Sequence, residues 1–180
     1  QSPRYTIGKY LPMERISVDL VGKLKKSKSG NQYVLMTTDM FTRFVTATPI
    51  ADKSKTTIAK ALLIHFGYFG VPYEITSDNG GEFVNGVVEE LLELVDAKKT
   101  TTLAYSHQEN SIVERVNQDI VKFIRHMIYG ERALHATWEE CLPFAVRIHN
   151  ATPHVTTKYA PAELLFGESV MLDRQILLPK

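Results

Sequence analysis

Cysteine and excess charge are both nearly missing from this chain of 180 residues. The single cysteine, Cys141, cannot form an internal disulfide, which is typical of a reducing compartment such as cytosol or nucleus. A net charge of +1 argues against a domain that coats nucleic acid by bulk electrostatics, because such domains are strongly basic. Any contact with DNA must therefore be local.

Long apolar runs and low-complexity tracts are also missing. The most apolar segment, residues 59–72, is too short to span a bilayer and contains His65, Gly67 and Gly70. No apolar signal core stands at the N-terminus. With 44% hydrophobic residues, the composition fits one compact domain with a substantial core, and we expect a soluble protein without a membrane partner.

The periodicity of the chain predicts a mixed α/β sheet. Residues 14–22, 32–39 and 43–50 have the pattern of strands joined by short loops, which favours an antiparallel meander. Two further strands, residues 74–78 and 98–103, alternate with helical patterns, so they should pair in parallel. We predict five strands, three antiparallel and two parallel, flanked by helices at 54–70, 83–95, from 111 onward, 136–152 with a kink or break at Pro143, and 161–167.

Three acids stand out, and each also has an ordinary structural interpretation. Asp19 lies in mid-strand, where Asp is disfavoured, although it could face solvent on an exposed sheet face. Asp78 precedes Asn79 in a sequence that also suits a turn. Glu114 follows Ser111 at the spacing of a helix capping box.

The placement of the three acids together favours a functional site more than any one of them does alone. Asp19 and Asp78 lie on strands that should be neighbours, and Glu114 lies in the first turn of the following long helix. Three such carboxylates could hold two Mg²⁺ or Mn²⁺ ions about 3.5–4 Å apart. A pair of such ions positions an attacking water or hydroxyl for phosphodiester cleavage and transfer.

At these residues the sequence resembles the catalytic core of retroviral and gypsy-type retrotransposon integrases, which have a ribonuclease H-like fold. The pattern is D, then D-35-E: Asp19 in "SVDLVG", Asp78 in "TSDNGGEF" and Glu114 in "SIVERVN". The segments "TTDMFTRF" and "TWEECLPFAVRIHNATPHVTTKYAPAELLFGE" extend the resemblance over roughly residues 12 to 168.

The resemblance implies a DNA integrase, a metal-dependent polynucleotidyl transferase that processes 3′ ends and transfers retroelement DNA ends into target DNA. Asp19, Asp78 and Glu114 would be catalytic and bind both metal ions; the implied DNA contacts are Tyr105, Gln108, Asn110 and Asn79. Asp39 and Arg43 match positions that we interpret as structural, bracing a hairpin. The family also implies a homodimer or higher oligomer, a possible host chromatin partner, and a nuclear location with a cytoplasmic stage.

The loop before Glu114 departs from the family pattern. It has Ser106, His107, Glu109 and Ser111 where the family usually has His, Pro, a small hydroxyl residue and Gly. Glu109 would place negative charge where DNA phosphates are expected. The alternative function is therefore a domesticated core that no longer transfers DNA and serves as a protein-interaction or DNA-docking scaffold. A ribonuclease H-type nuclease would share the metals but lacks the C-terminal resemblance.

For three other features we favour a structural role over a functional one. Lys23, Lys25, Lys26 and Lys28 suit a solvated hairpin tip better than a phosphate site. His65 lies on an apolar helix face and Trp138 in an amphipathic helix, so both are expected to pack in the core, Trp138 alternatively at a dimer contact. We divide the chain into an N-terminal linker (1–11), the core (12–168) and a tail (169–180), and expect a core cut from a larger protein.

Overall fold

The computed structural model describes residues 11–77, 86–87, 89–91, 110–129 and 137–167; the side chains of 110–114 and 127 fall outside that description. Its sheet has the order β3-β2-β1-β4. The strands are β1 (Arg15–Val21), β2 (Tyr33–Asp39), β3 (Val45–Ile50) and β4 (Glu74–Thr76). The first three form the predicted antiparallel meander, and β4 is parallel to β1. The fifth predicted strand, at 98–103, lies outside the described residues.

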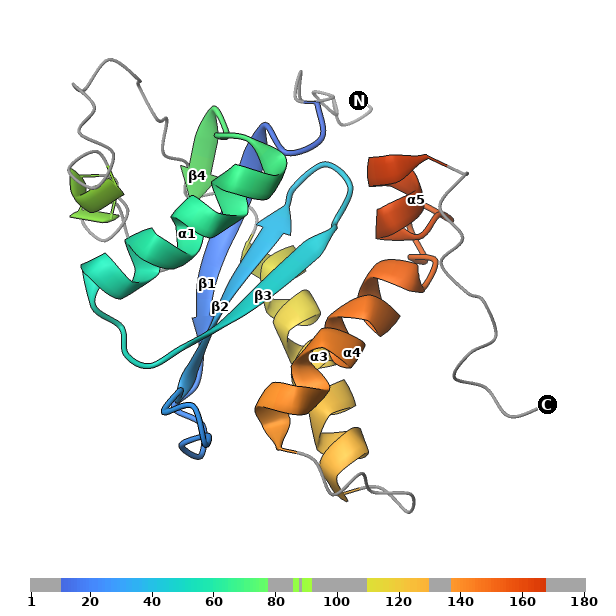
Figure 1. Cartoon of the computed structure of the whole chain (residues 1–180). Coiled ribbons are helices and arrows are strands. Elements are labelled where there is room, and N and C mark those ends of the chain that lie inside the picture. The colour runs from blue at the N-terminus through green and yellow to red at the C-terminus, as the bar shows by residue number, and fades with distance from the viewer. Residues whose placement is uncertain (1–10, 78–85, 88, 92–109, 130–136, 168–180) are drawn as a thin grey trace.

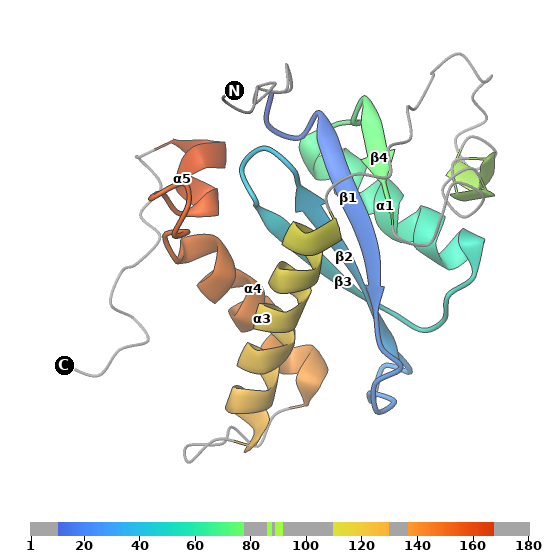
Figure 2. The ribbon, with the colours of Figure 1, turned by 180° about the vertical axis from the view of Figure 1, so that it is seen from behind.

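The helices form layers on both faces of the sheet (Figures 1 and 2). Helix α1 (Lys55–Phe69) covers one face, and α3 (Asn110–Tyr129) and α4 (Trp138–Ala151) cover the other. A short helix, α5 (Pro161–Phe166), follows α4. Of the predicted helix at 83–95, the described residues 86–87 and 89–91 are helical. No helix within the described ranges is long and apolar enough to cross a membrane.

Strand pleating sends alternate side chains into two separate cores. Ile16 and Val18 of β1 pack toward α1, together with Leu35 of β2. Val34 and Met36 of β2 pack toward α3 and α4. Because β1 points Ile16 and Val18 toward α1, its residues Ser17 and Asp19 face the α3 side. This alternation fixes the face on which Asp19 lies.

The helix boundaries follow the local sequence. Ser54 caps α1 by accepting a hydrogen bond from Thr57 N (3.2 Å), and Gly70 ends it at φ 85°, a conformation that favours glycine. One boundary expectation was wrong. Helix α3 begins at Asn110, so Ser111 lies inside its first turn and not at the N-cap. Helix α4 includes Pro143 without a break, and the expected kink there stays a prediction.

The turn between β2 and β3 is organised by the buried carboxylate of Asp39, which is 1% exposed. Its Oδ1 accepts from Met13 N (3.0 Å) and Phe41 N (3.3 Å). Its Oδ2 accepts from Thr42 N (3.0 Å) and Thr42 Oγ1 (2.5 Å). Arg43 then takes a positive φ of 68° and donates its N–H to Asp39 O at 2.9 Å. The structural interpretation of Asp39 is confirmed, through backbone donors in the turn and at Met13, which precedes β1.

The outer edge of the sheet is closed at Val45 by α4. The buried side chain of Asn150 accepts from Val45 N (2.9 Å) and donates to Val45 O (2.8 Å). This pair of bonds satisfies both backbone groups that an edge strand leaves open. It also fixes the last turn of α4 against the start of β3.

The core interpretations of His65 and Trp138 are confirmed. His65 is 7% exposed, and its Nδ1 lies 3.0 Å from Thr46 Oγ1. Burial lowers the pKa of His65 to about 4, against a smaller opposing effect of the Asp39 charge. Trp138 is 8% exposed and donates its indole N–H to Lys25 O at 2.7 Å.

Replacing Asp39 by Asn tests the hairpin. The amide has one acceptor oxygen and turns an NH₂ group toward backbone donors, so Asp39→Asn should lower the free energy of unfolding by about 2–4 kcal/mol. Urea denaturation measures the loss. As a control, the exposed Asp52 accepts a hydrogen bond from Ser54 N at 2.8 Å through one oxygen. The amide oxygen of Asn can accept the same bond, so Asp52→Asn should have little effect on stability. Equal losses in the two variants would contradict the assigned role.

His65 should make the protein less stable in acid. Its folded pKa of about 4 lies below the ordinary 6.5, so the unfolded chain binds the extra proton first as pH falls. The stabilisation is complete above pH 6.5 and is lost between 6.5 and 4, by up to about 3 kcal/mol. In pH-dependent denaturation, His65→Gln should flatten this slope while the exposed His126→Gln leaves it unchanged. A His65→Gln profile parallel to the unmodified protein would refute the prediction.

Candidate active site

Asp19 lies on β1 beneath the N-terminal half of α3. It pairs with Met36 of β2 across the antiparallel ladder. Ser17, two residues earlier on the same face, is 4% exposed, and Asp19 itself is partly buried. The solvent-facing interpretation of this sheet face is therefore wrong, because α3 covers it.

The carboxylate of Asp19 accepts a hydrogen bond on each of its oxygens. Its Oδ1 accepts from the N–H of Leu20 at 2.7 Å. Its Oδ2 accepts from the amide Nδ2 of Asn117 on α3. These two bonds set the orientation of the Asp19 carboxylate.

Asn117 brings the first turns of α3 to Asp19. It is 8% exposed, and no residue in the described part of the chain donates a hydrogen bond to its Oδ1. Glu114 lies three residues before Asn117 within the same helix, and positions three apart share one helix face. The backbone of Glu114 therefore stands one turn from a residue that touches Asp19. The Glu114 side chain is outside the described residues.

The other predicted site residues lie outside the description, in whole or in part. Asn110 is the first residue of α3, without a described side chain. Asp78, Asn79, Tyr105 and Gln108 belong to the ranges 78–85 and 92–109. The parallel register pairs Ser17 with Thr76, and two residues further along each segment the sequence has Asp19 and Asp78. Within the described ranges no cluster of three His, Cys, Asp or Glu side chains could hold a metal ion.

A polar pocket that the sequence analysis missed opens beside the start of α3. Its volume is about 230 Å³, and its lining includes Arg43, Arg115, Asp119, His149 and His154. The Nε2 atom of His149 lies 3.3 Å from Arg43 O, and burial lowers the pKa of His149. Arg115 and Asn117 both belong to the motif "ERVN" that contains Glu114, and this proximity in sequence was the signal that could have identified them. Spacing could not show which helix face each residue occupies.

The geometry agrees with the comparisons to known proteins. A family model described as the integrase core domain matches residues 9–107, more than half of the chain. The chain therefore belongs to the integrase core domain family, a family of polynucleotidyl transferases.

Two of the similar proteins have names that refer to retrotransposons. The chain is 32% identical over 162 residues to the retrovirus-related Pol polyprotein from transposon 412 of Drosophila melanogaster, covering 89% of this chain and 13% of that protein. It is 28% identical to gypsy retrotransposon integrase-like protein 1 of Rattus norvegicus, covering 89% of this chain and 30% of that protein. The chain thus spans less than a third of each relative's length.

Solved structures confirm the ribonuclease H-like fold. The dimeric catalytic core domain of HTLV-2 integrase, in complex with magnesium, matches with a TM-score of 0.63 at 18% identity, over 86% of this chain and 97% of that one. The simian T-cell lymphotropic virus intasome in complex with PP2A regulatory subunit B56 gamma matches with the same score at 17% identity, over 89% of this chain and 56% of that one.

Proposed function

We propose that the chain is the catalytic core of a retroelement integrase that carries out 3′ end processing and DNA strand transfer. Asp19, Asp78 and Glu114 would bind two Mg²⁺ or Mn²⁺ ions. The observation that carries the proposal is the hydrogen bond from Asn117 to Asp19, because it brings the Glu114 turn of α3 beside the mid-strand acid.

The described part of the site fits a hard divalent cation. Asp19 supplies a carboxylate, the ligand type that Mg²⁺ and Mn²⁺ prefer. Asn117 Oδ1 is a buried acceptor beside it to which no described residue donates, so a cation or its bound water would satisfy this oxygen. When bound, the ions would polarise the phosphodiester and activate the attacking oxygen.

The protein's own part is to hold ligands in place. Leu20 N and Asn117 Nδ2 fix the two oxygens of Asp19, so its carboxylate orientation is set before a ligand arrives. Met36 lies across the ladder from Asp19 and gives the acid an apolar neighbour. Asn117 acts as a positioning residue through this contact.

The wider assembly follows the family. Tyr105, Gln108, Asn110 and Asn79 would contact retroelement DNA ends or target DNA. The protein would act as a homodimer or higher oligomer in the nucleus after a cytoplasmic stage, with a host chromatin partner as a further possibility. The core would span residues 12–168.

Metal binding can be measured apart from catalysis. Mn²⁺ should bind the unmodified protein in isothermal titration calorimetry, and Asp19→Asn should abolish most of the heat. Asn117→Leu should weaken binding about 10–100-fold, because it removes the positioning contact. Asp52→Asn, at an exposed loop acid, should bind normally. Equal Mn²⁺ affinity in Asp19→Asn and Asp52→Asn would refute the assignment of Asp19.

Strand transfer tests the activity itself. With the full-length protein, Mn²⁺ and a DNA-end substrate, Glu114→Gln should reduce the product at least about 1,000-fold if Glu114 binds the catalytic ions. Glu139→Gln, on α4, is a matched control that should retain most activity. If the unmodified protein is no more active than Glu114→Gln, the proposed enzymatic function is refuted.

Glu109 favours the second candidate function, the non-transferring scaffold, because its charge opposes DNA phosphates. The same assay separates the two functions. A large gain of strand transfer in Glu109→Ser would show that the native loop limits catalysis. Normal activity with unchanged Glu109 would exclude the scaffold as the main role.

A further inference from the structure

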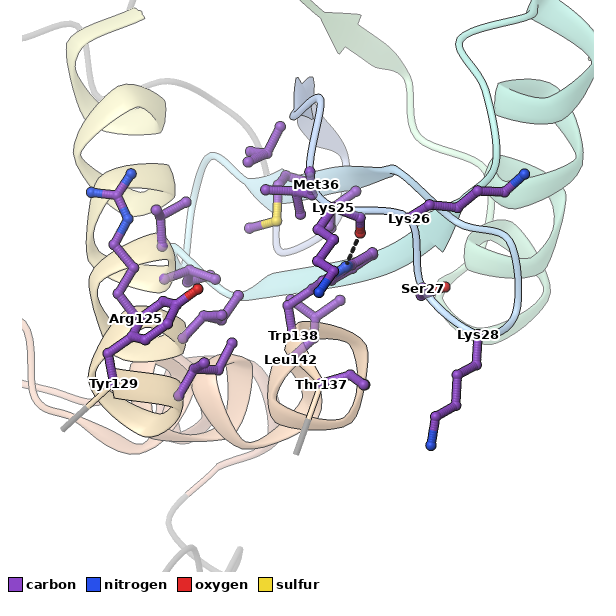
Figure 3. Close-up of a pocket in the computed structure, with 17 residues that line it drawn as sticks. Lys25, Lys26, Ser27, Lys28, Met36, Arg125, Tyr129, Thr137, Trp138 and Leu142 are labelled. Atoms are coloured by element: carbon purple, nitrogen blue, oxygen red, sulfur yellow. Dashed lines mark hydrogen bonds between the residues drawn. The ribbon is translucent and has the colours of Figure 1, made fainter. Parts of the chain in front are cut away.

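A second, larger pocket lies between the sheet, α3, α4 and the basic loop at residues 23–31 (Figure 3). Its volume is about 520 Å³, within the range of ligand pockets. The floor is apolar and comes from three elements: Val34, Met36, Ile120, Ile124, Trp138 and Leu142. Apart from Met36, which also lies across the ladder from Asp19, these residues belong neither to the predicted active site nor to the polar pocket.

Positive charge stands on two walls of this pocket. Lys25, Lys26 and Lys28 line it from the basic loop, and Arg125 lines it from α3. Figure 3 shows the Lys25 side chain reaching toward Tyr129 and Trp138, whereas Lys26 and Lys28 extend away from it. None of the described lining residues is Asp or Glu.

The basic loop is fixed before any ligand arrives. Trp138 Nε1 donates to Lys25 O at 2.7 Å, and Asn31 Nδ2 donates to Glu139 Oε1 at 2.9 Å, so two bonds join the loop to the start of α4. Leu24 N bonds Gln32 O at 2.7 Å across the loop neck. A preorganised wall lowers the entropic cost of binding. The lysines are exposed, as a solvated tip requires, but they stand on a rigid support.

The chemistry of the lining narrows the ligand. A phosphate backbone would lose hydration on an aliphatic floor, and the indole N–H of Trp138 is already used. A purely apolar ligand would make no favourable electrostatic interaction with the lysines and Arg125. A ligand that complements the pocket has an apolar group with negative charge on both sides of it, because Lys25 and Arg125 line opposite walls. A peptide segment supplies that arrangement through neighbouring side chains.

We propose that this pocket, between Lys25 and Trp138, docks a segment of another protein in which large apolar side chains are flanked by acidic residues. The apolar side chains occupy the floor, and the acids lie opposite Lys25 and Arg125. This interaction does not depend on metal binding or strand transfer.

Trp138 is the single tryptophan of the chain, so its fluorescence reports on this pocket. The probe is a blocked hexapeptide with two central leucines and two aspartates on either side. Its titration should give a saturable change with a dissociation constant of about 0.1 mM or below. Lys25→Glu should weaken binding about tenfold, since it turns attraction into repulsion. Lys23→Glu, in the same loop but outside the pocket lining, should bind within about twofold of the unmodified protein.

Two further peptides separate the contributions. Serines in place of the leucines, or lysines in place of the aspartates, should abolish the saturable signal. Circular dichroism checks that both loop variants are folded. The proposal is overturned by no saturable change in the unmodified protein, by equal losses in Lys25→Glu and Lys23→Glu, or by displacement of the peptide by an equal concentration of duplex DNA.

Discussion

The packing of α3 on the sheet is the constraint on which the rest of the molecule depends. Val116, Ile120 and Ile124 form one apolar stripe that packs against Val34 and Met36 of β2. The rotation of α3 about its axis is set by that stripe. The same rotation turns Asn117 toward Asp19 and Arg125 toward the larger pocket. One hydrophobic contact therefore positions the predicted catalytic acid and the proposed docking surface together.

Positive charge is concentrated locally, although the net charge of the chain is only +1. The loop between β1 and β2 carries lysines at one end of the sheet, and the turn between β2 and β3 carries Arg43 at the other end (Figure 1). Arg43 and Arg115 share a pocket with two histidines, whereas Lys25 borders an apolar floor. The chemistry beside these charges therefore distinguishes a polar pocket from an amphipathic one.

Much of the fold could be predicted from sequence because local patterns control it. The alternation in β1, the continuously apolar run in β2 and the helix end at Gly70 each act within a few residues. The burial of Asp19 could not be predicted, since it depends on α3, which lies 98 residues further along the chain. The same limit applies to Asn117 and Asn150, ordinary polar residues whose partners are set by helix packing. The family pattern identified the acids but not the residue that orients one of them.

The bond pair between Asn150 and Val45 has a consequence for how copies of this protein can meet. Alternate residues of β3 turn their backbone groups outward, and Val45 and Pro49 occupy such positions. Val45 is occupied by Asn150, and Pro49 has no N–H to offer. The outer edge of β3 is thus a poor template for a further strand, which guards against edge-to-edge aggregation. A continuous intermolecular sheet along this edge would lack the backbone groups of Val45 and the N–H of Pro49.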